Sequence, residues 1–108
     1  MKATETLKTA ADLIGGDRER DYGAVESNHD NIGRLWTAYW GNELARQGFR
    51  LVDEDGEEDV LEFDASDVLR MMSLLKIGRM QQGAHKDDNY TDAAGYIALA
   101  GEVADPRV

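Results

Sequence analysis

Apolar residues recur at helical spacing most clearly over about residues 27–47. Their positions there are Ile32, Leu35, Trp36, Tyr39 and Trp40, which form a stripe with a period of 3.6 residues. This pattern predicts a long helix whose stripe faces a protein core. We expect the three aromatic residues to be core residues first, although an aromatic ring beside a phosphate site could also stack on a base.

Three further stretches predict helices over about residues 4–14, 65–81 and 89–104. Their inward positions are expected to be Leu7, Ala11 and Ile14, then Val68, Met72 and Leu75, then Tyr96, Leu99 and Val103. Thr4 is a candidate N-cap for the first helix, and Gly15 and Gly16 end it. Asp64 followed by Asp67 forms a variant of the capping box before the third helix. Pro106 prevents the last helix from continuing.

An acidic segment separates the second and third predicted helices. Residues 49–63, FRLVDEDGEEDVLEF, contain two short runs with apolar residues on either side of an Asp-Gly turn. This order predicts a small β-hairpin, and an acidic flexible loop is the alternative. Four helices with short connections predict an all-α, antiparallel four-helix bundle. Residues 1–108 are expected to form one domain that carries residues 49–63 as an insertion.

The composition narrows the classes of function. Twelve Lys and Arg residues against 22 Asp and Glu residues give a net charge of −10, which argues against general nucleic-acid binding. The absence of cysteine excludes disulfides and thiolate metal sites. The first residues, MKATETLKTAADLIGG, do not resemble a signal peptide, and no apolar run approaches membrane-spanning length. We therefore expect a cytoplasmic protein without a membrane partner.

Charged residues extend the apolar stripes where the third helix ends and the fourth begins. Lys76 and Arg79 lie at the end of the third stripe, and Asp88 and Asp92 lie at the start of the fourth. Charges near a core need a partner, because their desolvation is otherwise costly. One interpretation is a structural network in which the cations neutralise the aspartates. The other is a ligand site, in which the carboxylates bind Mg²⁺ and the cations hold phosphate oxygens.

The loop before the second helix offers a second group of polar residues. Its candidate ligand-binding residues are Arg18, Arg20, Tyr22, Asn28 and His29. A helix N-terminus has free amide groups and a partial positive charge, so it favours phosphate. This loop is interpreted as the wall or lid of an anion pocket, or alternatively as an N-terminal cap with surface ion pairs. A lone histidine such as His29 is more commonly a satisfied core residue.

Three sequence segments together resemble a small family of uncharacterised phage and prophage proteins. They are DRERDYGAVESNHDNIGRLW, DVLRMMSLLKIGRM and DDNYTDAAGYIAL. The pattern resembles, more distantly, the all-α MazG-type nucleoside triphosphate pyrophosphohydrolases and the nucleotide-modification-associated phage domains. The resemblance implies a helical homo-oligomer, a dimer or tetramer, with a nucleotide-phosphate site between helices that also includes Tyr96.

The metal-binding carboxylates of the MazG type are only partly present. That resemblance implies Glu26, Asp88 and Asp92 as Mg²⁺ ligands, but His29 stands where a second glutamate is expected. Fewer oxygen ligands weaken the case for catalysis more than the case for binding. The leading hypothesis is therefore a nucleotide-binding phage protein, non-catalytic or weakly catalytic, that sequesters a nucleotide-derived signal of host defence.

Two other hypotheses remain open from the sequence. The first is a Mg²⁺-dependent pyrophosphohydrolase that uses the same carboxylates and cations. The second is an acidic interaction protein or DNA mimic, because eight of the twelve residues 53–64 are Asp or Glu. Such a charge run is more commonly a solvated loop.

Overall fold

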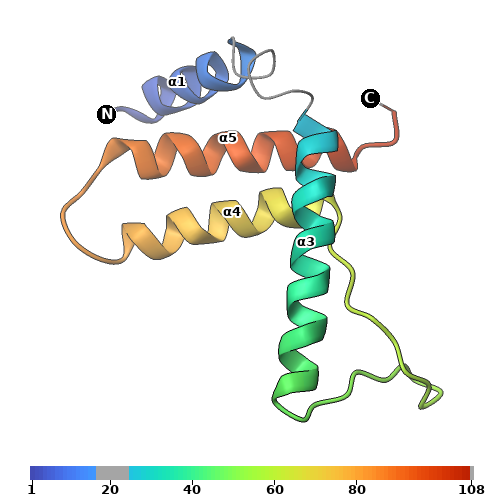
Figure 1. Cartoon of the computed structure of the whole chain (residues 1–108). Coiled ribbons are helices and arrows are strands. Elements are labelled where there is room, and N and C mark those ends of the chain that lie inside the picture. Colours follow the sequence, from blue (N-terminus) through green and yellow to red (C-terminus); the bar gives the residue numbers. More distant parts are fainter. Residues whose placement is uncertain (17–24, 108) are drawn as a thin grey trace.

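The computed structural model describes residues 1–16 and 25–107. These residues form four helices: α1 (Ala3–Gly15), α3 (Val25–Arg46), α4 (Ala65–Met80) and α5 (Asp87–Ala104) (Figure 1). The predicted all-α class and the four predicted helices are confirmed, with ends within two residues of those expected. None of the helices in the described residues has the length and apolarity that crossing a membrane requires.

Helices α4, α5 and α1 form one layer, in which α4 and α5 run antiparallel and α1 lies on the other side of α5 (Figure 1). Small residues allow α4 and α5 to approach closely. The hydroxyl of Ser73 donates a buried hydrogen bond of 2.9 Å to the carbonyl oxygen of Ala93. Val68 and Leu69 are the largest apolar side chains that are fully buried. On the other face of α5, Gly95 lies against Ile14 of α1.

Helix α3 does not join this layer as a fourth antiparallel helix, so the predicted antiparallel bundle is wrong. It crosses the layer at the start of α4 and then projects away from it (Figure 1). Its buried residue, Gly33, lies directly against the backbone of Phe63. The crossing is held by hydrogen bonds from the amide of Phe63 to the Thr37 hydroxyl and from the amide of Ala65 to the Asp30 carboxylate, each of 3.0 Å.

The aromatic stripe of α3 is not a core stripe, contrary to the expectation from its period. Leu35, Tyr39 and Trp40 are exposed, while Trp36 is half-buried and packs edge-on against the ring of Phe63. The periodicity was correct for a helix, but most of the face that it marks is left uncovered by the residues that the structure describes, because α3 projects beyond the layer. An amphipathic pattern shows that a face needs covering, without showing what covers it.

Residues 49–63 form an extended arm that returns alongside α3 to the start of α4 (Figure 1). Gly48, which has a positive φ of 82°, turns the chain back at the end of α3. The predicted β-hairpin is not formed as strands in the described residues. A single antiparallel bridge joins Val52 and Glu58, and the Asp53 carboxylate accepts amide hydrogen bonds from Asp55 and Glu57 inside the turn.

Asp64 begins α4 as predicted and provides a test of how the fold depends on pH. Its carboxylate accepts hydrogen bonds from the Asp67 amide, at 2.9 Å, and from the Ser66 hydroxyl, and these bonds lower the pKa of Asp64. We expect Asp64→Ala to lower the free energy of unfolding by about 1 kcal/mol at neutral pH, because the amide loses its acceptor. Urea titrations measure this difference.

The control is Asp64→Asn, which keeps an acceptor but cannot ionise. Because folding lowers the pKa of Asp64, its ionised form stabilises the fold above the usual aspartate pKa, and this contribution is lost as pH falls through the lowered value. The stability difference between wild type and Asp64→Asn should therefore shrink on acidification. A difference that stays constant at acidic pH would contradict the assignment.

Candidate functional site

A hollow of about 660 Å³ lies where α4 ends and α5 begins. Its lining combines cationic, anionic and amide side chains with the turn between the two helices. The residues are Lys76, Arg79, Gln82, Gly83, Ala84, Lys86, Asp88, Asn89 and Asp92. All four charged residues that the sequence predicted to meet at this end, Lys76, Arg79, Asp88 and Asp92, are brought together there.

Lys76 and Asp92 form the central ion pair of the hollow. The Lys76 ammonium lies 2.9 Å from a carboxylate oxygen of Asp92, and the two side chains are 13% and 27% exposed. Both face inward because Lys76 lies one turn after Met72, which is half-buried on α4, and Asp92 lies three residues after Asn89, which is buried on α5. This pair agrees with the structural-network interpretation, although Lys76 and not Arg79 is the partner of Asp92.

Arg79 and Lys86 give the hollow its free positive charge. Arg79 is exposed and does not point into the core as its spacing suggested. Neither side chain forms an ion pair with a residue that the structure describes. Three cations against two carboxylates leave a positive balance in a chain whose net charge is −10. The hollow is therefore a place where an anion can approach an otherwise acidic protein.

The amide-bearing residues of the hollow were missed from the sequence. Asn89 is buried, and Gln82 belongs to the turn that follows α4. In that turn Gly83 has a positive φ of 74°, which glycine adopts without strain. Asn89 and Asp92 are three residues apart on one helix, and this spacing was the available signal for Asn89.

The candidates at the start of α3 lie elsewhere within the chain. Glu26, Asn28 and His29 occupy its first two turns, close to the start of α4, as the hydrogen bond between Asp30 and Ala65 shows. The hollow is at the opposite end of α4, roughly 22 Å away along a 16-residue helix. Figure 1 shows this separation. Within one chain, the candidate residues at the start of α3 and those in the hollow therefore do not form a single site.

The remaining predicted residues are placed as follows. His29 is half-buried, and its Nδ1 donates to the carbonyl oxygen of Val25 at 2.7 Å, which satisfies one ring nitrogen within the helix. Tyr96 is half-buried one turn after Asp92 and does not line the hollow. Arg18, Arg20 and Tyr22 lie outside the described residues.

The described residues do not form a carboxylate-rich metal site. Among them, no group of three or more His, Asp and Glu side chains is arranged to hold a metal ion. The predicted set Glu26, Asp88 and Asp92 is thus not assembled as one cluster within the chain. The two aspartates are together in the hollow, where Asp92 is already paired with Lys76.

A second polar cluster begins α5 beside the hollow. His85 Nε2 and an Asp87 carboxylate oxygen are 2.8 Å apart, and the imidazole stacks on Tyr90 with ring centres 5.2 Å apart. The hydrogen bond from His85 lowers the pKa of Asp87. The chain's amino group lies 3.7 Å from the same carboxylate, so this cluster also ties the start of α1 to α5.

The chain belongs to the family described as "Domain of unknown function (DUF6378)", whose model matches residues 5–104. The chain is 34% identical over 101 residues to the Gene 55 protein of Mycobacterium phage L5, covering 94% of this chain and 53% of that protein. It is 30% identical over 102 residues to the Gene 55 protein of Mycobacterium phage D29, covering 94% and 55%.

These matches confirm the predicted resemblance to uncharacterised phage proteins. The chain spans about half the length of the curated relatives it matches. No solved structure matches it significantly. The names of these two relatives state no activity.

Proposed function

We propose that the hollow binds the phosphate groups of a nucleotide or a nucleotide-derived small molecule. The observation that carries the proposal is the cationic balance of the hollow in a strongly acidic chain. Arg79 offers a planar fork of donors that suits phosphate oxygens, and Lys86 offers a second positive charge on the same rim. A volume of about 660 Å³ is within the range of small-molecule sites.

The ion pair in the hollow has a defined part in this proposal. Lys76 is held by Asp92 at 2.9 Å, so it is positioned before a ligand arrives. A phosphate that reaches Lys76 shares it with Asp92, while Arg79 and Lys86 together carry more positive charge than the one remaining carboxylate, Asp88, can balance. Asn89 and Gln82 add neutral donors and acceptors that can recognise a base or a sugar.

We propose binding in preference to hydrolysis. The pyrophosphohydrolase hypothesis draws on the MazG-type resemblance and requires carboxylates that hold Mg²⁺, for which Asp88 and Asp92 are the candidates in this hollow. A phage protein that binds a nucleotide without consuming it could sequester a signal used by host defence.

The acidic arm, residues 49–63, supports the third hypothesis of an interaction protein only through its charge.

Thermal-shift measurements with nucleoside triphosphates, cyclic dinucleotides and ADP-ribose derivatives, with and without Mg²⁺, test the proposal. A true ligand at one hundred times its Kd adds about 2.7 kcal/mol to the stability of the folded state, which raises Tm. We expect Arg79→Gln to weaken binding by roughly tenfold or more, because it removes a charge-assisted hydrogen bond.

Arg34→Gln is the matched control, because the same substitution is made at an exposed position of α3 that does not line the hollow. It should leave the affinity unchanged. If no compound raises Tm, or if Arg34→Gln weakens binding as much as Arg79→Gln, the hollow is not the site. Measuring Tm without ligand for both variants separates loss of binding from loss of stability.

A further inference from the structure

The chain exposes much more surface than a folded monomer of its size. Its accessible surface is 8055 Å², whereas a monomer of 12.0 kDa is expected to expose about 6000 Å². Its radius of gyration is 16.7 Å, against about 13 Å for a compact domain of 108 residues. The difference of roughly 2000 Å² per chain is surface that folding alone leaves uncovered.

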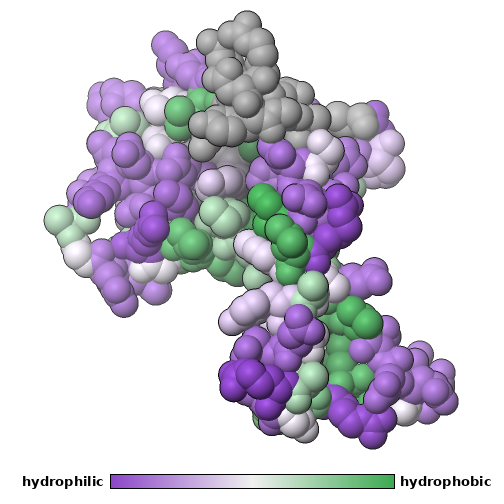
Figure 2. All heavy atoms as spheres, in the orientation of Figure 1, coloured by the Kyte–Doolittle hydropathy of each residue, from purple (hydrophilic) through white to green (hydrophobic). Residues whose placement is uncertain are grey.

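Much of the uncovered apolar surface lies on one unit, which we call the projecting unit and define as residues 35–61. Leu35 and Tyr39 of α3 are 63% and 64% exposed, and Trp40 beside them is 44% exposed. Figure 2 shows this unit as a separate lower part of the molecule, where apolar residues lie between hydrophilic flanks. A helix that projects into water without packing gains little from its apolar face.

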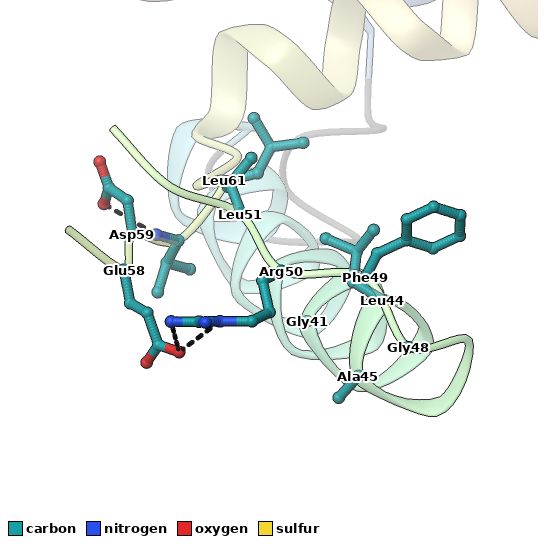
Figure 3. Close-up of a pocket in the computed structure, with 11 residues that line it drawn as sticks. Gly41, Leu44, Ala45, Gly48, Phe49, Arg50, Leu51, Glu58, Asp59 and Leu61 are labelled. Carbon is teal, nitrogen blue, oxygen red and sulfur yellow. Dashed lines mark hydrogen bonds and ion pairs between the residues drawn. The ribbon is translucent and has the colours of Figure 1, made fainter. Parts of the chain in front are cut away.

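The projecting unit also contains an apolar groove of about 410 Å³ between α3 and the arm. Leu44 comes from α3, while Phe49, Leu51, Val60 and Leu61 come from the arm (Figure 3). Within the arm, the Arg50 guanidinium contacts the Glu58 carboxylate at 2.9 Å, and both residues line the groove (Figure 3). The projecting unit therefore carries two complementary features. One is the apolar ridge of Leu35, Tyr39 and Trp40 on α3, and the other is the groove, which can receive such a ridge from another chain.

We propose that the projecting unit is the interface with a second copy of this chain, in a two-fold symmetric dimer. In such a dimer the same surface meets itself, so one unit that carries both a ridge and a groove can satisfy both copies. If each chain buried its excess surface, the interface would cover roughly 4000 Å², within the range of obligate homodimers. This proposal does not depend on the proposed ligand.

A second copy is favoured over a foreign partner by the nature of the surface. An apolar helix face and groove of this extent are exposed to water whenever the chain is folded alone, so they favour a partner that is always available. A second copy of the chain meets this condition, because it is present wherever the first copy is. Each copy carries a net charge of −10, so the copies repel at long range and their contact must be apolar. Added salt screens this repulsion and should strengthen the dimer. A basic partner held by the acidic arm would instead be released by salt.

Sedimentation velocity of the full chain over a wide dilution series, at low and high salt, tests the proposal. We expect twice the chain mass of 12.0 kDa, with dissociation on dilution that is suppressed by salt. Both tryptophans, Trp36 and Trp40, lie in α3, so dissociation should also shift the emission to longer wavelength as Trp40 meets water. Leu35→Glu should halve the mass at concentrations where the wild type is dimeric.

Leu7→Glu is the matched control, because Leu7 on α1 is also 63% exposed and lies outside the projecting unit. It should leave the mass unchanged. Phe49→Glu, in the arm, is a second variant that does not alter a helix, and it too should give a monomer with unchanged helical circular dichroism.

A wild-type chain that sediments as a monomer throughout overturns the proposal. So does a dimer that survives both Leu35→Glu and Phe49→Glu, one that Leu7→Glu disrupts equally, or one that salt weakens. Because these measurements use no ligand, they can fail while the phosphate-binding proposal stands, and the reverse also holds.

Discussion

Gly33→Ala should destabilise this protein severely, by about 3 kcal/mol or more, although alanine is normally the better helix former. A Cβ atom at Gly33 would overlap the carbonyl oxygen of Phe63, where the arm enters α4. The obstacle is backbone and cannot rotate away. The helix and the arm must separate, which strains the nearby hydrogen bonds from Phe63 to Thr37 and from Ala65 to Asp30.

Gly101→Ala makes the same substitution on the exposed side of α5, where a Cβ would meet nothing within 4 Å. It should be neutral or stabilise the protein by up to about 1 kcal/mol. Urea unfolding followed by circular dichroism at one fixed protein concentration gives both values. Equal effects of the two substitutions would show that α3 and the arm are not in the contact described.

Leu69→Ala should cost about 2–5 kcal/mol of unfolding free energy, the usual range for a buried leucine. Leu69 of α4 is fully buried, with 0% of its surface exposed. Apart from Val68, the other apolar residues that are buried in the described part of the chain are alanines. Few large side chains therefore carry the core, and the loss of one leaves a cavity with little around it that can collapse inward.

The control for Leu69→Ala is Leu74→Ala, which makes the same substitution at an exposed position of the same helix. Leu74 is 63% exposed, so its truncation removes little buried surface and should change the unfolding free energy by less than about 0.5 kcal/mol. Both variants are measured by urea midpoints at the same concentration, since association would raise the apparent stability. A Leu69→Ala variant as stable as Leu74→Ala would contradict the core assignment.

The charged end of the helix pair was predictable because two short-range rules determine it. Residues three or four positions apart share a helix face, and antiparallel neighbours bring the end of one helix to the start of the next. These rules placed Lys76, Arg79, Asp88 and Asp92 in one hollow. They could not choose between Lys76 and Arg79 as the partner of Asp92, because both lie near the same helix end.

The division of the predicted site into two places was not predictable from the same rules. Asn28 and His29 were assigned to the wall or lid of an anion pocket because they lie at the start of the second predicted helix. In the structure α3 begins at the opposite end of α4, where Asp30 accepts a hydrogen bond from the first amide of that helix. This contact joins residues 35 positions apart, and no local pattern encodes it.

The sequence by itself determined where the helices lie and where they end. Apolar periodicity, the Asp64 cap and Pro106 act within a few residues, so their effect does not depend on the rest of the fold. Only the tertiary structure decided the direction of α3, since it depends on the close contact of Gly33 with Phe63. The same crossing decided that Leu35, Tyr39 and Trp40 face outward, because a helix that leaves the layer carries its apolar face beyond the reach of its own core.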